Sequence, residues 1–287
     1  MTSERTRAPR RARALDGAPG RHEPRLPGSG GDISQVTRQF PTRNLRFYLT
    51  APSPCPYLPG RRERKVFTGL EGVEALGLND ALTHAGFRRS QNIAYRPACD
   101  ACDACVSARV RVEAFETSKR WRKILARNED LSRSLRPADA TEEQFWLLRR
   151  YLAARHALGG MADMTLLDYA AMVEETSVRT HIVEYRYTAP GPDKGELAAA
   201  ALVDVLKDGL SLVYSYFDTR EPKRSLGAFT ILDHIMQARA AGFPHLYLGY
   251  WVRGSEKMDY KAEFQPLELL IAGAWTPFRK SGEGGGA

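Results

Sequence analysis

The succession of helical and extended segments after residue 140 is the feature that most constrains the fold. Thr141 and Gln144 have the spacing of a capping box, so a helix is predicted to begin there. The segment Lys207-Asp208-Gly209 separates two apolar runs and predicts a hairpin. The predicted order is helix, helix, three strands, helix, strand and strand, over residues 141–156, 166–175, 180–187, 197–207, 210–217, 225–241, 245–251 and 267–274.

This order resembles that of GNAT-type acyltransferase domains, in which a mixed sheet has helices on both faces. The sequence therefore predicts an α+β protein with a GNAT-like acyltransferase fold. In the first half, strands are predicted over 45–49, 92–95 and 106–112, and helices over 79–85 and 117–131. The predicted divisions are a disordered basic tail, a basic domain that contains the cysteines, a C-terminal GNAT-like domain and a flexible tail, over residues 1–36, 37–137, 138–278 and 279–287.

Positive charge is concentrated in the first half of a chain whose net charge is +8. Residues 1–30 hold seven arginines against three acidic residues, without the apolar core of a secretory signal. Residues 109–136 hold nine basic residues against four acidic ones. Two shorter clusters are Arg61, Arg62, Arg64 and Lys65, and Arg88 with Arg89. Together they favour a polyanionic partner such as nucleic acid, although each alone also fits a solvated helix face.

No apolar run approaches the roughly 18 residues that a membrane span needs, so the chain is predicted to be soluble and cytoplasmic.

Three of the four cysteines, Cys99, Cys102 and Cys105, follow one another at two-residue spacing, and Cys55 lies upstream in a proline-rich loop. This spacing lets successive thiolates turn toward one centre, as in zinc and iron–sulfur loops. Two alternatives stay open at this point. The thiols could pack as small buried side chains beside a turn, or a pair of them could sense redox conditions.

The segment Arg224-Ser225-Leu226-Gly227 runs from a turn into a predicted helix. Main-chain N–H groups at a helix start attract anions, and a glycine lets a ligand approach closely. GNAT enzymes hold the pyrophosphate of acyl-CoA with a similar motif, but Phe229 stands where that motif has a small residue. A donor other than a CoA ester is therefore favoured, with an ordinary capped helix as the alternative.

Gly249 interrupts an aromatic strand, which predicts a bulge or a close approach of another group to the backbone. Lys257 and Lys261 follow with helical spacing and could hold an acidic group, although each also fits a solvated turn. No Ser/His/Asp or Cys/His triad can be assembled from the spacing of residues.

As a set, these motifs resemble the bacterial aspartate/glutamate leucyltransferases and their relatives, the eukaryotic arginyl-tRNA–protein transferases. The resemblance covers about residues 40–278. Its motifs are Cys55-Pro56-Tyr57-Leu58-Pro59-Gly60-Arg61, Gly86-Phe87-Arg88-Arg89-Ser90, Tyr95-Arg96-Pro97 with the cysteine triplet, Arg224-Ser225-Leu226-Gly227, Leu248-Gly249-Tyr250-Trp251 and Met258-Asp259-Tyr260-Lys261. It implies an architecture of two related GNAT-like units.

The resemblance implies transfer of an amino acid from aminoacyl-tRNA, with leucyl-tRNA favoured, to proteins with N-terminal Asp or Glu. The modified proteins would pass to a downstream adaptor and protease system of the N-end rule pathway. It assigns tRNA contacts to Arg61, Arg62, Arg88, Arg89, Arg224, Ser225 and Gly227. It places the transfer at Gly249 and Tyr250, and recognition of the acidic residue at Lys257, Tyr260 and Lys261.

No cofactor is required for the transfer, because the aminoacyl ester is already activated. In eukaryotic relatives the equivalent cysteines are associated with an iron–sulfur cluster, so the resemblance implies a cluster or zinc on Cys55, Cys99, Cys102 and Cys105.

Three other functions remain open from the sequence. An arginyl-tRNA donor would use the same acceptors. A GNAT acetyltransferase would use acetyl-CoA, and an RNA-binding zinc module on a GNAT-like scaffold would bind tRNA whether or not it is aminoacylated.

Overall fold

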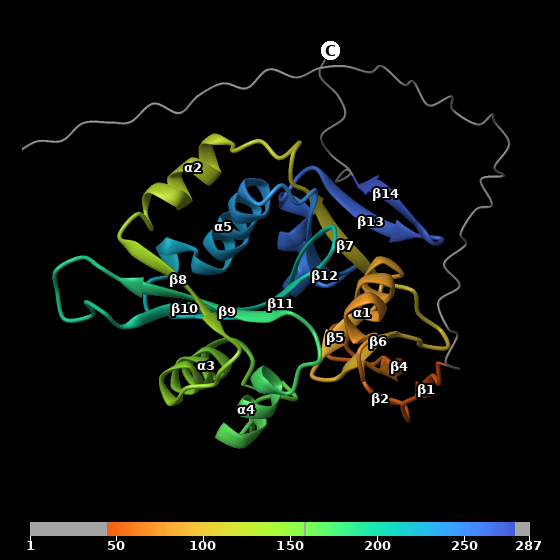
Figure 1. Ribbon diagram of the computed structural model, residues 1–287. Helices are drawn as coiled ribbons and strands as arrows, with labels where there is room; N and C mark the ends of the chain where they lie inside the picture. The colour runs from red at the N-terminus through yellow and green to blue at the C-terminus, as the bar shows by residue number, and fades with distance from the viewer. Residues whose placement is uncertain (1–44, 158, 279–287) are drawn as a thin grey trace, which may run out of the picture. The chain divides into compact units, whose positions relative to one another are not determined.

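A computed structural model describes residues 45–157 and 159–278, and the predicted tails 1–36 and 279–287 lie outside this range. Its largest element is an eight-stranded mixed sheet (Figure 1). From one edge to the other, the sheet contains β14 (Ala274–Phe278), β13 (Leu267–Ile271), β7 (Cys105–Arg111), β12 (His245–Val252), β11 (Gly209–Phe217), β10 (Leu197–Val205), β9 (Thr180–Tyr187) and β8 (Leu131–Pro137).

Helices cover both faces of this sheet (Figure 1). On one face lie α2 (Lys119–Ala126) and α5 (Leu226–Ala240), and on the other lie α3 (Glu142–Arg155) and α4 (Leu166–Glu174). The sequence of β10 explains this arrangement, because all but its last residue are buried and every residue except Asp204 is apolar, as expected of a strand covered on both faces. The predicted α+β, GNAT-like fold is confirmed by this layered sheet, in which α5 connects the parallel strands β11 and β12.

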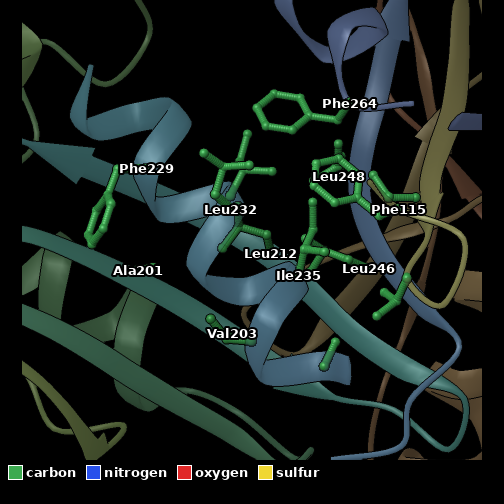
Figure 2. Packing of buried hydrophobic residues seen from close by; sticks show 14 of the residues in the cluster. Phe115, Ala201, Val203, Leu212, Phe229, Leu232, Ile235, Leu246, Leu248 and Phe264 are labelled. Atoms are coloured by element: carbon green, nitrogen blue, oxygen red, sulfur yellow. The ribbon is translucent and has the colours of Figure 1, made fainter. Parts of the chain in front are cut away.

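The core beneath α5 is formed by side chains that project from the helix toward the sheet (Figure 2). Phe229, Leu232 and Ile235 of α5 pack in one cluster with Ala201 of β10 and Leu212 of β11. Burying each large apolar side chain stabilises the fold by about 1.5–3 kcal/mol. This face of α5 is therefore fixed on the sheet, and the helix start is held at a defined place.

A second, four-stranded sheet is formed by the first half of the chain, in the order β1 (Tyr48–Leu49), β4 (Lys65–Gly69), β6 (Ile93–Pro97) and β5 (Arg88–Ser90). Helix α1 (Ala75–His84) packs on it through a small apolar cluster. The short strands β2 (Ser53–Pro54) and β3 (Arg62–Glu63) pair separately.

The buried pair Arg89–Asp204 ties this four-stranded sheet to the eight-stranded one. Arg89 lies in β5 and Asp204 in β10, and both side chains are 1% exposed. Nε of Arg89 donates to Oδ2 of Asp204 at 2.6 Å, and Nη2 donates to Oδ1 at 2.8 Å. Strand β5 is thereby held beside β10 and β11.

Two predicted elements differ from the structure. The predicted helix 117–131 ends at Ala126, because the side-chain amide of Asn128 donates to Ile124 O at 2.8 Å and to Arg224 O at 2.9 Å, and the chain then enters β8. The predicted strand 267–274 is the hairpin of β13 and β14, turned at Ala272 and Gly273 with positive φ. The predicted domain boundary at residue 137 and the predicted pair of related units stay predictions. Strand β7, which precedes that boundary in the chain, lies within the eight-stranded sheet.

No helix among residues 45–157 and 159–278 is long and apolar enough to cross a membrane.

Candidate active site

The candidate site lies where β11 and β12 separate. These parallel strands pair only from Gly209–His245 to Ser211–Tyr247, although both continue well beyond that point. In the same region the register between β12 and β7 shifts between Tyr247 and Gly249, so the predicted irregularity at Gly249 is confirmed as a β-bulge. Separation of the strands leaves main-chain groups without ladder partners, and these need other hydrogen-bonding groups.

Arg88 supplies such a group on the β11 side. Its Nη2 donates to Val213 O at 2.7 Å and to Leu212 O at 3.4 Å, although Arg88 itself lies in β5. The guanidinium also lies over the ring of Tyr250, with Cζ 5.8 Å from the ring centroid. A side chain from the first half of the chain thus enters the gap between two strands of the second half.

Gly249 makes room for this arginine. Its φ is +71°, and a β-carbon at this position would overlap the guanidinium of Arg88. A positive φ together with a close neighbour requires glycine. The bulge also changes which face of the sheet the strand presents, since Leu248 packs in the core under α5 whereas Tyr250 packs against Tyr57 and Tyr95 of the first half.

Lys261 is the second basic side chain at the gap, on the β12 side. It lies in the short 3₁₀ helix η2 (Tyr260–Glu263), is 5% exposed, and donates from Nζ to Tyr250 O at 2.6 Å. Burial, with a smaller contribution from the charge of Arg88, holds the pKa of Lys261 well below its ordinary value. The two strands are thus each capped by a basic side chain where they separate.

The predicted pairing of Lys257 with Lys261 is wrong. Lys257 lies on α6 (Glu256–Asp259) and is exposed, whereas Lys261 is buried in the following 3₁₀ turn. Burial lowers the pKa of His156, and the charge of Lys257 adds to this effect, so Lys257 lies near the end of α3. The change from α to 3₁₀ geometry places the two ammonium groups in different environments. Tyr260, between them, is 44% exposed.

Tyr250 has a different position from the one predicted for a transfer residue. Its side chain is 3% exposed, and its hydroxyl lies within hydrogen-bonding distance of Tyr95 O at 3.0 Å and Gly86 O at 3.1 Å. Burial is the main cause of its raised pKa. The hydroxyl therefore joins the two sheets, and it is the main chain of this strand that borders the gap.

Further tyrosines surround the same space. Tyr57 belongs to the motif that begins at Cys55, whereas no motif in the sequence marks Tyr151 or Tyr214. Burial raises the pKa of Tyr57 to about 12, with a smaller contribution from Tyr95, while Arg88 acts in the opposite direction. Burial also raises the pKa of Tyr214 in β11, and the phenols of Tyr151 in α3 and Tyr57 contribute to it. Neutral phenols from three separate segments therefore lie around the two basic side chains.

The four cysteines line one cavity of about 430 Å³, together with Tyr57, Tyr95 and Tyr250. Within the described ranges, no group of three or more His, Cys, Asp or Glu side chains is placed to hold a metal ion. Burial, with smaller effects of the neighbouring thiols, raises the pKa of Cys105 to about 12. As arranged here, the donor set does not fit the zinc or iron–sulfur cluster that the sequence suggested.

The basic residues predicted to contact tRNA fall into two groups. Arg61 and Arg62 are exposed and line the cysteine cavity. Arg89 is buried against Asp204, so the prediction that it contacts tRNA is wrong, since no phosphate can reach its guanidinium. Arg224 is 17% exposed and forms two hydrogen bonds with Asp130, at 2.7 and 2.8 Å.

The start of α5 is explained by packing. Ser225 has a φ of +54° and forms no side-chain cap. A β-carbon on Gly227 would lie 2.8 Å from the ring of Phe217, which itself packs on Tyr151 at 4.9 Å between ring centroids. The close neighbour that requires glycine at this position is therefore an aromatic side chain of the protein.

Two sequence-family models match the chain. One is described as arginine-tRNA-protein transferase, N terminus, and matches residues 53–123; the other, for the C terminus of the same family, matches residues 143–271. An aspartate/glutamate leucyltransferase of Phenylobacterium zucineum (strain HLK1) is 65% identical over 241 residues, which cover 84% of this chain and 94% of that protein. This chain belongs to the arginine-tRNA-protein transferase family, which these two models describe.

Other relatives support the same family assignment. An aspartate/glutamate leucyltransferase of Caulobacter vibrioides (strain NA1000 / CB15N) is 61% identical, over 84% of this chain and 86% of that protein. An aspartate/glutamate leucyltransferase of Bradyrhizobium sp. (strain ORS 278) is 59% identical, over 89% of this chain and 98% of that protein. Among solved structures, the C-terminal domain of a putative lysylphosphatidylglycerol synthetase from Agrobacterium fabrum matches at a TM-score of 0.41 and 19% identity, over 70% of this chain and 63% of that one. The crystal structure of FemX matches at a TM-score of 0.40 and 9% identity, over 65% of this chain and 62% of that one.

Proposed function

We propose that this transferase moves leucine from leucyl-tRNA to the N-terminal amine of proteins that begin with Asp or Glu, and so marks them for N-end rule degradation. The observation that carries the proposal is the 65% identity to an aspartate/glutamate leucyltransferase across 94% of that protein. Arginine is the alternative donor, because the two matching family models are named for arginyl transfer.

The start of α5 argues against acetyl-CoA as the donor. A pyrophosphate would need the free main-chain N–H groups and an available arginine at this helix start. Here Phe217 covers Gly227, Arg224 is engaged with Asp130, and Phe229 fills the position of a small residue. An aminoacyl ester carried on tRNA has no such requirement at this place.

The chemistry of transfer requires little from side chains. The aminoacyl ester is already activated, and an α-amine with a pKa near 8 is partly neutral at neutral pH. The main tasks are to position the amine against the ester and to stabilise the developing oxyanion. We assign these tasks to the main chain around Gly249 and Tyr250 in the strand gap. The Tyr250 side chain holds that strand against the first half of the chain through its hydroxyl.

The exposed basic residues are the proposed tRNA contacts. Arg61 and Arg62 border the cysteine cavity, and each phosphate contact that they make would contribute to the salt dependence of binding. For R61A, we expect weaker tRNA binding and a salt slope smaller by about one contact. Ser225 stays a proposed contact for the acceptor end through its main chain, whereas Gly227 is covered by Phe217 and is not proposed as a contact. Lys257 and Tyr260, which are exposed, stay proposed contacts for the acceptor peptide.

The proposed reaction uses no resident metal, because ester and amine need none. Metal analysis of the purified protein and of C102S tests whether the thiols rearrange to bind zinc or a cluster. A cytoplasmic location and a downstream adaptor and protease belong to the same proposal, since charged tRNA and N-end rule degradation meet there.

One assay tests the function. Purified protein is mixed with labelled leucyl- or arginyl-tRNA and with peptides that begin with Asp, Glu, Ala or Lys. We expect label from leucyl-tRNA on the Asp and Glu peptides alone. If only arginyl-tRNA gives labelled peptide, the donor is arginyl-tRNA and not leucyl-tRNA. Equal label on all four peptides would overturn the assignment of Asp and Glu as acceptors.

A further inference from the structure

Arg88 differs from its neighbour Arg89 in having no counter-ion within the part of the chain that the structure describes. Among the described residues, no carboxylate forms an ion pair with Arg88, whereas Arg89 is paired with Asp204. The hydrogen bonds of Arg88 use Nη2 alone and end on two carbonyls of β11, so that within the described chain Nε and Nη1 have no hydrogen-bond acceptor. Neither nitrogen is among the fully buried polar atoms without a partner, so both stay available to an incoming anion.

The surroundings of Arg88 contain a buried lysine and neutral groups. Burial, together with the charge of Arg88, lowers the pKa of Lys261, so that this side chain holds its proton less firmly than an ordinary lysine. Around the two basic side chains stand the phenols of Tyr57 and Tyr250, on which the charge of Arg88 also acts. Among the described residues, Arg88 therefore stands in the gap without a negative partner, and low solvent exposure strengthens its attraction for a small anion.

The location of Arg88 limits which anion this is. Its guanidinium lies against Gly249, inside the gap to which we assign the transfer, and not on the exposed surface where Arg61 and Arg62 line the cavity. A tRNA phosphate lies on a bulky backbone and suits the exposed arginines better. A carboxylate on a short side chain can enter a gap and accept two parallel hydrogen bonds from one guanidinium.

We propose that Arg88 binds the side-chain carboxylate of the acceptor's first residue and so selects Asp or Glu. The inference rests on the proposed function and assigns its acceptor specificity to a residue of the four-stranded sheet. Binding there places the adjacent α-amine at the main chain of Gly249, while Arg89 and Asp204 keep β5 in position. Lys261 holds the main chain of Tyr250 beside the site without having to contact the peptide.

The test compares matched peptides that begin with Asp or Asn, which have the same shape and differ in charge. R88Q keeps a side chain of similar polarity and removes the charge. R96Q is the matched control, because Arg96 lies on the neighbouring strand β6, is exposed and contacts the ring of Phe87. The measurements are kcat/KM for both peptides with leucyl-tRNA, tRNA binding by filter retention, and thermal unfolding.

For R88Q we expect kcat/KM to fall roughly 10- to 100-fold with the Asp peptide and to change little with the Asn peptide, with tRNA affinity unchanged. R96Q should keep the wild-type ratio of kcat/KM for the Asp peptide to kcat/KM for the Asn peptide. R88K, which keeps a positive charge, should retain part of that ratio. Equal losses with both peptides, a preserved ratio or weakened tRNA binding in R88Q would overturn the inference. A wild-type protein that does not prefer Asp over Asn would instead overturn the proposed function, so the two failures are distinguishable.

Discussion

The guanidinium of Arg88 lies against the bare α-carbon of Gly249, so that a residue of the four-stranded sheet fills the bulge of a strand in the eight-stranded one. Two requirements meet at this glycine. The backbone has a φ of +71°, and a β-carbon would overlap the arginine. The contact joins the two sheets at the place where β11 and β12 separate.

We therefore expect G249A to displace Arg88 and to abolish most of the transfer activity. Backbone strain at positive φ alone should cost about 1–2 kcal/mol in the free energy of unfolding. G273A is the control, because Gly273 has a φ of +81° and a β-carbon added there would meet nothing within 4 Å. Urea unfolding and transfer rates separate the two effects. Equal activity in both variants would show that the arginine can move aside without consequence.

A second prediction concerns Asp204, whose carboxylate accepts two hydrogen bonds from Arg89 and a third from Thr180 at 2.8 Å. D204N leaves the buried guanidinium without a counter-charge and should lower the free energy of unfolding by about 3–5 kcal/mol.

The control for D204N is E263Q, which removes the carboxylate that pairs with the exposed Arg120 and should cost about 0–1 kcal/mol. Urea denaturation measures both variants. If D204N costs no more than E263Q, the Arg89–Asp204 pair does not hold the sheets together.

The layered fold and the bulge at Gly249 could be predicted from the sequence, because both depend on local patterns. Helix and strand periodicities repeat within a few residues, and a glycine within an aromatic strand is itself a local signal. The roles of Arg88 and Arg89 could not be predicted. Successive residues in a strand point to opposite sides, and the partner Asp204 is 115 positions away in the chain.

The two lysines illustrate a different limit. Helical spacing placed Lys257 and Lys261 on one face, but the α turn ends at Asp259 and a 3₁₀ turn follows. The carbonyl of Tyr250, on the strand where β12 has separated from β11, then accepts a hydrogen bond from Lys261 and holds this side chain inside. The position of Lys261 is set by its hydrogen bond to a carbonyl of another element. Such a tertiary contact cannot be predicted from the spacing of neighbouring residues.

A third prediction concerns pH and the pair Asp130–Arg224. The hydrogen bonds from Arg224 lower the pKa of Asp130 below its ordinary 3.8. The folded pKa is therefore the lower one, so the stabilisation is fully present above pH 3.8 and is lost as the pH falls through the folded value. D130N should cost about 1–2 kcal/mol near neutral pH, and this cost should shrink as the pH falls below 3.8.

The control for D130N is E129Q, since Glu129 is exposed and forms no ion pair among the described residues. Unfolding free energies of wild type, D130N and E129Q would be measured from neutral pH downward. A constant difference between wild type and D130N at every pH would contradict the titration of Asp130 as its origin.

The last prediction concerns Cys105, whose buried thiol has its pKa raised from an ordinary 9.0 to about 12. Alkylation requires the thiolate, so at about pH 8 Cys105 should react roughly a thousandfold more slowly than an ordinary thiol, and about tenfold faster for each unit that the pH is raised. Mass spectrometry after timed iodoacetamide treatment measures the rate, with the same protein in urea as the unfolded reference. Reaction at the unfolded rate at this pH would mean that the thiolate is stabilised in the fold, and would return the cysteine cavity to consideration as a metal site.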